Sequence, residues 1–299
     1  MSLNELPPQT AGAKRGTEVD GRRSMLAALA AVPVAFGAGV MGTANAQSQA
    51  TSARLPATGR VAIVTGSSRG IGAATALRLA RDGHAVVVNY EKNRDLAAAV
   101  VRDIESTGGR AIAVQADVSD PRAVIHLFDA AESSFGGVDV VVANAGIMRL
   151  APMKDMRDED FDRMFAVNAK GGFNTLREAA RRVRDGGRIL ALSSSITQLR
   201  TGTYGPYAAT KMAQDMYVSC LAKELEGRNI AVNAIAPGVV NTPLFTDGKS
   251  TQLIAGFAQR TPFKRIGEPA DIADVIAALC SRDCVWVHGQ TIFANGGIV

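Results

Sequence analysis

Short apolar runs alternate with longer amphipathic segments along the chain from about residue 60 onward. The apolar runs are rich in Val, Ile and Ala, a composition typical of buried strands. Seven runs are predicted to be strands: Val61–Thr65, Ala85–Asn89, Ala111–Ala116, Val138–Ala143, Arg188–Leu192, Ile230–Ile235 and Gln290–Ala294. Helical segments between them give βαβ spacing, which predicts a single-domain α/β fold with a doubly wound parallel sheet and helices on both faces.

The beginning of the chain has a different pattern. The arginine pair Arg22-Arg23 precedes an apolar run rich in Ala and Gly, and Ala44-Asn45-Ala46 then offers a small-x-small cleavage site. These features predict a secretory signal peptide over residues 1–46, and the paired arginines favour the twin-arginine route. Residues 47–58 are mostly small and polar, which predicts a linker before a folded domain over residues 59–299.

The leader has two other interpretations, a disordered leader and an uncleaved membrane anchor. Pro33 and several glycines within the apolar run argue against a stable spanning helix. We therefore expect the mature protein to be exported, for example to a periplasm, without membrane association after cleavage. A signal that is not used would leave the protein in the cytoplasm.

The composition is that of a globular protein, with 47% hydrophobic and 20% charged residues. Although the formal net charge is +5, the basic side chains are scattered, so nucleic-acid binding is not predicted. The histidines and cysteines lack ligand-like spacing, so no metal site is predicted either. They are His84, His126, His288, Cys220, Cys280 and Cys284. The last two cysteines are either two buried thiols or, in an exported protein, a disulfide.

A glycine-rich turn follows the first predicted strand. Residues 65–72 read Thr-Gly-Ser-Ser-Arg-Gly-Ile-Gly and lead into a helical segment, 73–80. Gly66 and Gly70 let the backbone turn tightly and approach a ligand, and Gly72 lets the helix pack closely on the strand. This order of elements places backbone N–H groups against a pyrophosphate, so we predict a nucleotide site in a Rossmann-type sheet of about seven strands.

Polar segments also follow the fourth, fifth and sixth predicted strands. They are Asn144-Ala145-Gly146, Ser193-Ser194-Ser195 and Pro237–Thr242. In an open α/β sheet, ligands bind beyond the carboxyl ends of the strands, so all three segments should face the nucleotide site. Taken singly, each segment is also an ordinary turn.

Tyr207 and Lys211 begin a helical segment between the fifth and sixth strands. Their i, i+4 spacing puts them on one helix face, where a cation would stabilise a phenolate and lower the pKa of Tyr207. Such a phenol exchanges a proton with a carbonyl or an alcohol near neutral pH. Taken alone, the pair is more often a packed ring and a solvated charge.

The order and spacing of these motifs resemble the short-chain dehydrogenase/reductase family over essentially the whole predicted domain. The resemblance implies a general acid/base at Tyr207, and a lysine at Lys211 that lowers its pKa and holds the nicotinamide ribose. It implies a serine at Ser194 that polarises the substrate oxygen, chosen from three serines because it lies thirteen positions before the tyrosine. Asn168 is implied to support a proton-relay water near the lysine, and Tyr204 is excluded because no lysine lies four residues on.

The turn, the strand ends and the resemblance together imply a row of cofactor contacts. These are Gly66, Ser68, Arg69, Gly70, Ile71, Gly72, Asn89, Tyr90, Asp117, Val118, Asn144, Ala145, Gly146, Tyr207, Lys211, Pro237, Gly238, Val240 and Thr242. In the family, Asp117 and Val118 correspond to adenine contacts, and Val240 and Thr242 to nicotinamide contacts.

The cofactor choice depends on the end of the second predicted strand. This strand ends at Asn89-Tyr90, without the carboxylate that commonly accepts the ribose 2′-OH of NAD. Arg69 in the glycine turn and Lys92 beyond the strand are cations suited to a 2′-phosphate. Glu91 argues against NADP(H) unless its side chain points away from the nucleotide site. We therefore predict NADP(H), with NAD(H) less favoured.

The segments expected to line a substrate pocket are 147–155, 196–206 and 244–266. Their scattered bases include Arg149, Arg200 and Lys249. These bases either favour an anionic substrate or form a solvated rim. Three short motifs resemble those of NADPH-dependent aldehyde reductase-like and 3-oxoacyl-carrier-protein reductase-like members of the family. They are Gly248-Lys249, Thr261-Pro262-Phe263 and Gly267-Glu268-Pro269. We predict reduction of a small aldehyde or ketone, and the alternatives are a 3-oxoacyl-thioester reductase and a non-catalytic NADP-binding protein.

The C-terminal segment 286–297 resembles the last strand and tail of family members that form homotetramers. An exposed strand edge and apolar helix faces need to be covered, which a symmetric interface achieves. We expect a homotetramer or homodimer that acts on a small carbonyl or alcohol substrate.

Overall fold

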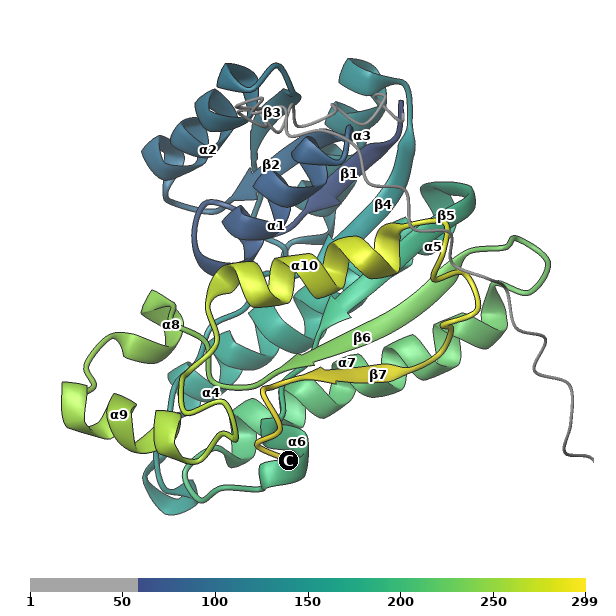
Figure 1. Ribbon diagram of the computed structural model, residues 1–299. Coiled ribbons are helices and arrows are strands. Elements are labelled where there is room, and N and C mark those ends of the chain that lie inside the picture. The colour runs from purple at the N-terminus through teal and green to yellow at the C-terminus, as the bar shows by residue number, and fades with distance from the viewer. Residues whose placement is uncertain (1–58) are drawn as a thin grey trace, which may run out of the picture. The chain divides into compact units, whose positions relative to one another are not determined.

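The computed structural model describes residues 59–299, whose sheet and helices are shown in Figure 1. The predicted signal peptide and linker lie outside the described residues. The strands are β1 (Val61–Val64), β2 (Ala85–Tyr90), β3 (Arg110–Gln115), β4 (Val138–Ala143), β5 (Val183–Leu192), β6 (Ala231–Pro237) and β7 (Thr291–Ala294). They form one sheet in the order β3-β2-β1-β4-β5-β6-β7, with every neighbouring pair parallel, which confirms the predicted fold class.

Helices fill the connections between the strands. They are α1 (Gly70–Arg81), α2 (Arg94–Ser106), α3 (Pro121–Phe135), α4 (Asp158–Met164), α5 (Gly171–Arg182), α6 (Ile196–Leu199), α7 (Gly205–Glu224), α8 (Pro243–Thr246), α9 (Thr251–Gln259) and α10 (Pro269–Cys280), with a 3₁₀ turn η1 (Met153–Asp155) and a π-helix η2 (Phe165–Lys170). None of the helices between residues 59 and 299 is long and apolar enough to cross a membrane.

Helices cover both faces of the sheet, and successive strand residues point to opposite faces. Val61 and Ile63 join the core under α3, α5 and α7, whereas Ala62 and Val64 join the core under α1, α2 and α10. Figure 1 shows α1 and α10 on the near face of the sheet, with α7 behind it. Continuous apolar runs, rather than alternating ones, therefore mark these strands.

Some predicted strand ends differ from the structure. β5 begins at Val183, well before the predicted Arg188, because Val183 pairs with Val138 of β4 ahead of a register shift. The segment between them is polar and glycine-rich, so no apolar pattern marks it. β6 continues to Pro237 because that residue pairs with Ala294 of β7.

The strand order reverses between β1 and β4. Connections from these two strands leave to opposite sides of the sheet, which opens a crevice at their carboxyl ends. The loops after β1, β4, β5 and β6 meet at this edge, so the predicted site residues are brought together there.

Candidate active site

The β1–α1 turn adopts a backbone conformation that favours glycine. Gly66 and Gly70 have φ values of +63° and +59°. A Cβ on Gly72 would lie 2.5 Å from the Gly66 carbonyl oxygen, so α1 can approach β1 this closely only with glycine there. The first turn of α1 contains no acidic residue, and its N–H groups form an anion-binding helix terminus.

Side chains from neighbouring strands hold this turn in place. Asn89 is buried, and its Oδ1 accepts a hydrogen bond from the Gly66 N–H at 3.0 Å. Asn144 Nδ2 donates to the Thr65 carbonyl at 2.8 Å, while Thr65 Oγ1 accepts from the Asn144 N–H at 2.9 Å. Asn89 and Asn144 therefore position the glycine turn. The structural role of Thr65 was not predicted, because its partner Asn144 lies in the loop after β4, far along the chain.

A groove of about 390 Å³ follows the carboxyl edge of the sheet past β2, β1 and β4. Every residue predicted to contact the cofactor lines this groove or the pocket that adjoins it. Arg69 is exposed at the groove, and its guanidinium makes no hydrogen bond or ion pair that involves residues 59–299. Lys92 lies nearby and is 80% exposed. A helix N-terminus with two cations beside it fits a dinucleotide that carries a 2′-phosphate.

Two acidic residues lie on the same groove wall. Asp117 Oδ1 accepts hydrogen bonds from the N–H and Oγ of Ser119 at 2.9 Å and 2.8 Å. Burial alone would raise the pKa of Asp117, but the hydrogen bonds from Ser119 and the ion pair with Arg163 hold that pKa below its usual value. Glu91 lines the groove as well. The carboxylate that argues against NADP(H) in the sequence therefore does lie on the groove wall.

Tyr207 and Lys211 lie one turn apart on α7, with 7% and 6% of their surfaces exposed. The Lys211 Nζ atom is 5.8 Å from the centre of the Tyr207 ring and donates a hydrogen bond to the Leu192 carbonyl at 2.7 Å. The end of β5 therefore fixes the lysine. Ser194 lines the same pocket as Tyr207, and its hydroxyl lowers the pKa of the Tyr207 phenol.

The other two serines of the β5 loop have structural partners. Ser193 Oγ donates to the Lys211 carbonyl at 3.4 Å, and Ser195 Oγ donates to the Ala236 carbonyl at 3.1 Å. Of the three, Ser194 is the one whose hydroxyl lowers the pKa of Tyr207. Its catalytic role stays a prediction from the spacing of thirteen residues.

Asn168 lies in the π-helix η2, a widened turn of the kind often found at functional sites. Its amide accepts from the Ile147 N–H and donates to the Ile147 carbonyl, both at 2.8 Å, and donates to Thr210 Oγ1 at 3.1 Å. The Asn168 carbonyl accepts from Gln214 Nε2 at 2.6 Å. Asn168 thus ties together the β4 loop, η2 and α7 around Lys211. Gln214 was not predicted, because an interior helix position gives no such signal.

The pKa values of the pair differ from the prediction. Burial raises the pKa of Tyr207 to about 12, and the nearby Ser194 hydroxyl opposes this only in part. Burial lowers the pKa of Lys211 to about 8, against the attraction of Asp215. Desolvation dominates because both groups are enclosed and Lys211 is bonded to a carbonyl. Tyr207 therefore keeps its proton at neutral pH, as a general acid requires.

A second pocket, of about 150 Å³, opens beside the groove with Ser194 and Tyr207 in its wall. Apolar and aromatic side chains from all three predicted segments line it: Met148, Leu199, Tyr204, Leu244, Phe245 and Phe257. The last two rings meet edge to face at 5.3 Å. Tyr204, excluded as the catalytic tyrosine, is therefore a pocket residue.

The basic residue at this pocket differs from those named in the sequence. Arg149, Arg200 and Lys249 are absent from its lining, which contains Arg260 instead. Arg149 lies 3.6 Å from Asp160 in an ion pair. Arg260 stacks over the Phe257 ring at 5.5 Å. Arg260 directly follows α9 and lies within the predicted pocket segment 244–266.

The three cysteines are free thiols, with Cys220 exposed, Cys280 buried and Cys284 half-buried. Burial raises the pKa of Cys280 to about 12. Within residues 59–299, no group of three His, Cys, Asp or Glu side chains is arranged to hold a metal ion.

Comparisons with known proteins identify the family. The family model described as enoyl-(acyl carrier protein) reductase matches residues 66–299. The chain is 44% identical over 259 residues to the chloroplastic NADPH-dependent aldehyde reductase-like protein of Arabidopsis thaliana, covering 82% of this chain and 96% of that relative. The chain belongs to the short-chain dehydrogenase/reductase family.

Two further relatives refine the comparison within this family. A versicolorin reductase of Emericella nidulans is 41% identical over 251 residues, covering 80% of this chain and 95% of its own. A short-chain dehydrogenase of Burkholderia cenocepacia, solved in complex with NADP, superposes with a TM-score of 0.77 at 37% identity, covering 82% and 99% of the two chains. This short-chain dehydrogenase/reductase is an oxidoreductase, and its cofactor is NADP(H).

Proposed function

We propose that this short-chain dehydrogenase/reductase reduces a small aldehyde or ketone with an apolar or aromatic body, using NADPH. The observation that carries the proposal is the placement of Tyr207 with Ser194 and Lys211 in the wall of an apolar pocket beside the cofactor groove. The names of its relatives, an aldehyde reductase-like protein and a versicolorin reductase, point in the same direction.

The side chains at the pocket can carry out the remaining chemistry. When bound, NADPH supplies the hydride. Ser194 and Tyr207 hydrogen-bond to the carbonyl oxygen and polarise it. Tyr207 passes its proton to that oxygen, so the carbonyl becomes an alcohol and the tyrosine a phenolate. The ammonium of Lys211 stabilises the phenolate through its charge.

Replacement of Tyr207 by phenylalanine tests this function. Tyr207→Phe should lower the rate of NADPH oxidation with a reactive aldehyde or diketone by about 10²–10⁴-fold, because the general acid is lost. NADPH binding, followed by nucleotide fluorescence, should stay unchanged. Tyr204→Phe is the matched control, since Tyr204 lines the same pocket. A near wild-type rate for Tyr207→Phe would show that the mechanism is wrong.

A 3-oxoacyl thioester is the second candidate substrate. Arg260 in the pocket lining favours it, because a guanidinium suits the phosphate groups of a carrier arm. Arg260→Met should then raise KM for an acyl-coenzyme A substrate and leave KM for a neutral aldehyde unchanged. An equal effect on both substrates would remove the support for a thioester.

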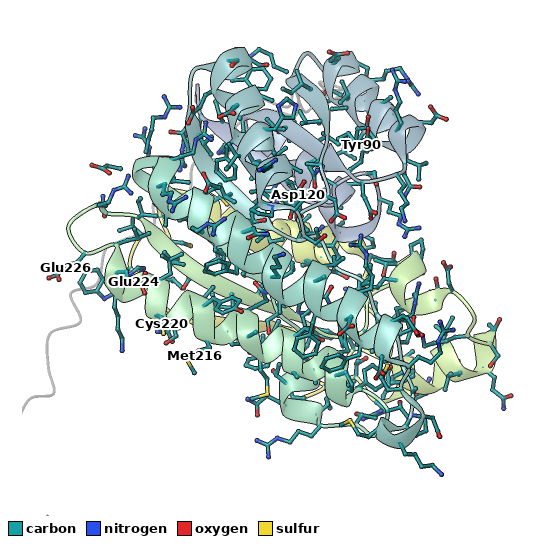
Figure 2. All side chains as sticks on the ribbon, turned by 180° about the vertical axis from the view of Figure 1, so that it is seen from behind. Tyr90, Asp120, Met216, Cys220, Glu224 and Glu226 are labelled. Carbon is teal, nitrogen blue, oxygen red and sulfur yellow. The ribbon has the colours of Figure 1, made fainter. Side chains whose placement is uncertain are left out.

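We further propose that the protein forms a homotetramer or homodimer. Large apolar side chains are exposed on α5, on α7 and before β7: Phe173 at 43%, Met212 at 56%, Met216 at 62% and Trp286 at 96%. Figure 2 shows Met216 and Cys220 along the outer side of α7. Light scattering at micromolar concentration should give a dimer or tetramer mass, and a monomer mass would refute this assembly.

Export through the twin-arginine route is also a proposal, supported by the sequence of residues 1–46. Mass spectrometry of fractionated cells should find a mature chain that begins at Gln47 outside the cytoplasm. A full-length chain confined to the cytoplasm would contradict it.

A further inference from the structure

A glutamate lies on the groove wall beside the two cations that are expected to face a 2′-phosphate. Glu91 directly follows β2 and lines the groove together with Arg69 and Lys92. A carboxylate after the second strand commonly accepts a hydrogen bond from the 2′-OH of NAD. The same charge, left unpaired, would repel a 2′-phosphate. The use of NADP(H) therefore requires that Glu91 be neutralised.

Arg163 supplies the counter-charge from α4. Its Nη2 atom donates to Glu91 Oε1 at 3.1 Å. The Lys92 ammonium lies 3.4 Å from the same oxygen. The Glu91 backbone is held too, because Gln115 Nε2 donates to its carbonyl at 2.8 Å. The Glu91 carboxylate is thus engaged by protein groups rather than left to accept from a ribose.

The same guanidinium holds the second carboxylate of the groove. Arg163 Nη2 donates to Asp117 Oδ2, and Nη1 donates to Ser119 Oγ, both at 3.1 Å. Arg163 itself is not part of the groove lining. It acts on a bound nucleotide only through the two carboxylates with which it pairs.

We propose that Arg163 is a positioning residue that sets the preference for NADP(H) through Glu91. By pairing with Glu91 it removes an uncompensated negative charge from the groove wall. Arg69 is then left to attract the 2′-phosphate, while Lys92 pairs with Glu91. Without Arg163, the carboxylate becomes available to a ribose 2′-OH, which favours NAD(H). This inference concerns cofactor choice and holds whatever carbonyl compound is the substrate.

A purely structural role for Arg163 leads to a different result. Arg163 connects α4 to the segment after β3, and η2 with Asn168 follows α4 directly. If the arginine only braced these segments, its loss would weaken the binding of every adenine nucleotide alike.

Calorimetric titration of the full chain with 2′,5′-ADP and 5′-AMP separates the two roles, because these probes differ only in the 2′-phosphate. Arg163→Met should raise the Kd of 2′,5′-ADP about tenfold, the effect of one charge-assisted contact, and that of 5′-AMP by less than about twofold. The selective effect should shrink at high salt. Adding Glu91→Gln should restore 2′,5′-ADP binding, since the charge that Arg163 neutralises is then gone.

Arg157→Met is the matched control. Arg157 precedes α4 and pairs with Glu159 and Asp160 at 3.3 Å and 3.8 Å, away from the groove lining. It should leave both dissociation constants unchanged.

Glu91→Gln alone provides a test that does not depend on the folding of Arg163→Met. Because Glu91 is already paired, the Kd of 2′,5′-ADP should change by less than about threefold. A much larger gain in affinity would overturn the proposal. Equal weakening of both probes in Arg163→Met, or no recovery with Glu91→Gln, would overturn it as well. None of these measurements requires turnover, so they stay informative even if no carbonyl compound is reduced.

Discussion

The nucleotide groove is lined by backbone atoms, which buried side chains hold in place through hydrogen bonds. The substrate pocket is lined instead by side chains on short helices. In the groove, Asn89, Asn144 and Thr65 hold the glycine turn through hydrogen bonds between strands. In the pocket, Phe245 and Phe257 of α8 and α9 meet through ring contacts. A hydrogen-bonded backbone tolerates little change, while apolar side chains can be exchanged with modest cost. Cofactor binding is therefore tied to the fold, and substrate choice to a few replaceable residues.

The largest expected effect comes from a methyl group in the glycine turn. A Cβ on Gly72 would lie 2.5 Å from the Gly66 carbonyl oxygen and 2.6 Å from Asn144 Nδ2. Gly72→Ala should lower the free energy of unfolding by about 1–3 kcal/mol and abolish measurable NADPH binding. Gly256→Ala in α9 is the control, because no atom lies within 4 Å of its added Cβ. Denaturant unfolding and nucleotide fluorescence would measure both effects, and equal behaviour of the two variants would break the comparison.

The next largest expected effect is a difference between NADPH and NADH in their use of this groove. Arg69→Ala should raise KM for NADPH about tenfold to a hundredfold, the value of a lost charge-assisted contact, with much less effect on KM for NADH. Lys92→Ala should do the same more mildly, since a flexible, hydrated ammonium contributes less. Steady-state kinetics with both cofactors checks this. If both constants rose together, Arg69 would be a pyrophosphate contact only.

The pH dependence of kcat/KM should show whether the proposed chemistry depends on the charge of Lys211. The pKa of Lys211, about 8, means that the lysine is charged below that pH and loses its charge above it. We expect kcat/KM for carbonyl reduction to fall about tenfold per unit above pH 8, while Tyr207, with a pKa of about 12, stays protonated. Asp215→Asn should move the fall to lower pH, because the attraction of Asp215 raises the pKa of Lys211. A flat profile up to pH 10 would exclude a role for the lysine charge.

The smallest expected effect is on substrate binding in the pocket. Phe257→Ala removes one ring of the edge-to-face pair and should raise KM for an aromatic carbonyl compound about 2–10-fold. NADPH binding should not change, because Phe257 lines the pocket and not the groove. Parallel measurements of KM and NADPH affinity would test this. A comparable loss of NADPH affinity would mean that the two regions are not separable.

Most of the groove could be predicted because its signals are local. The turn around Gly66 and Gly70 and the segments at the strand ends are short, and a parallel sheet collects the ends of its strands at one edge. The roles of Arg163, Gln214 and Arg260 could not be predicted. The partners of Arg163 and Gln214 lie many residues away. Arg260 lies within a predicted pocket segment, but nothing in the neighbouring sequence distinguishes it from the other bases there.

Hydrophobic periodicity and motif spacing are properties of the chain, so they predict the sheet, its glycine turn and the order of Asn168, Ser194, Tyr207 and Lys211. The environments of these residues arise only when the chain folds. Folding enclosed Tyr207, so that burial raises its pKa where the i, i+4 pair with Lys211 predicted a lower value. It also paired Glu91 with Arg163, which lies 72 positions further along the chain. Burial and pairing across such distances exist only after folding, since both depend on which elements pack together.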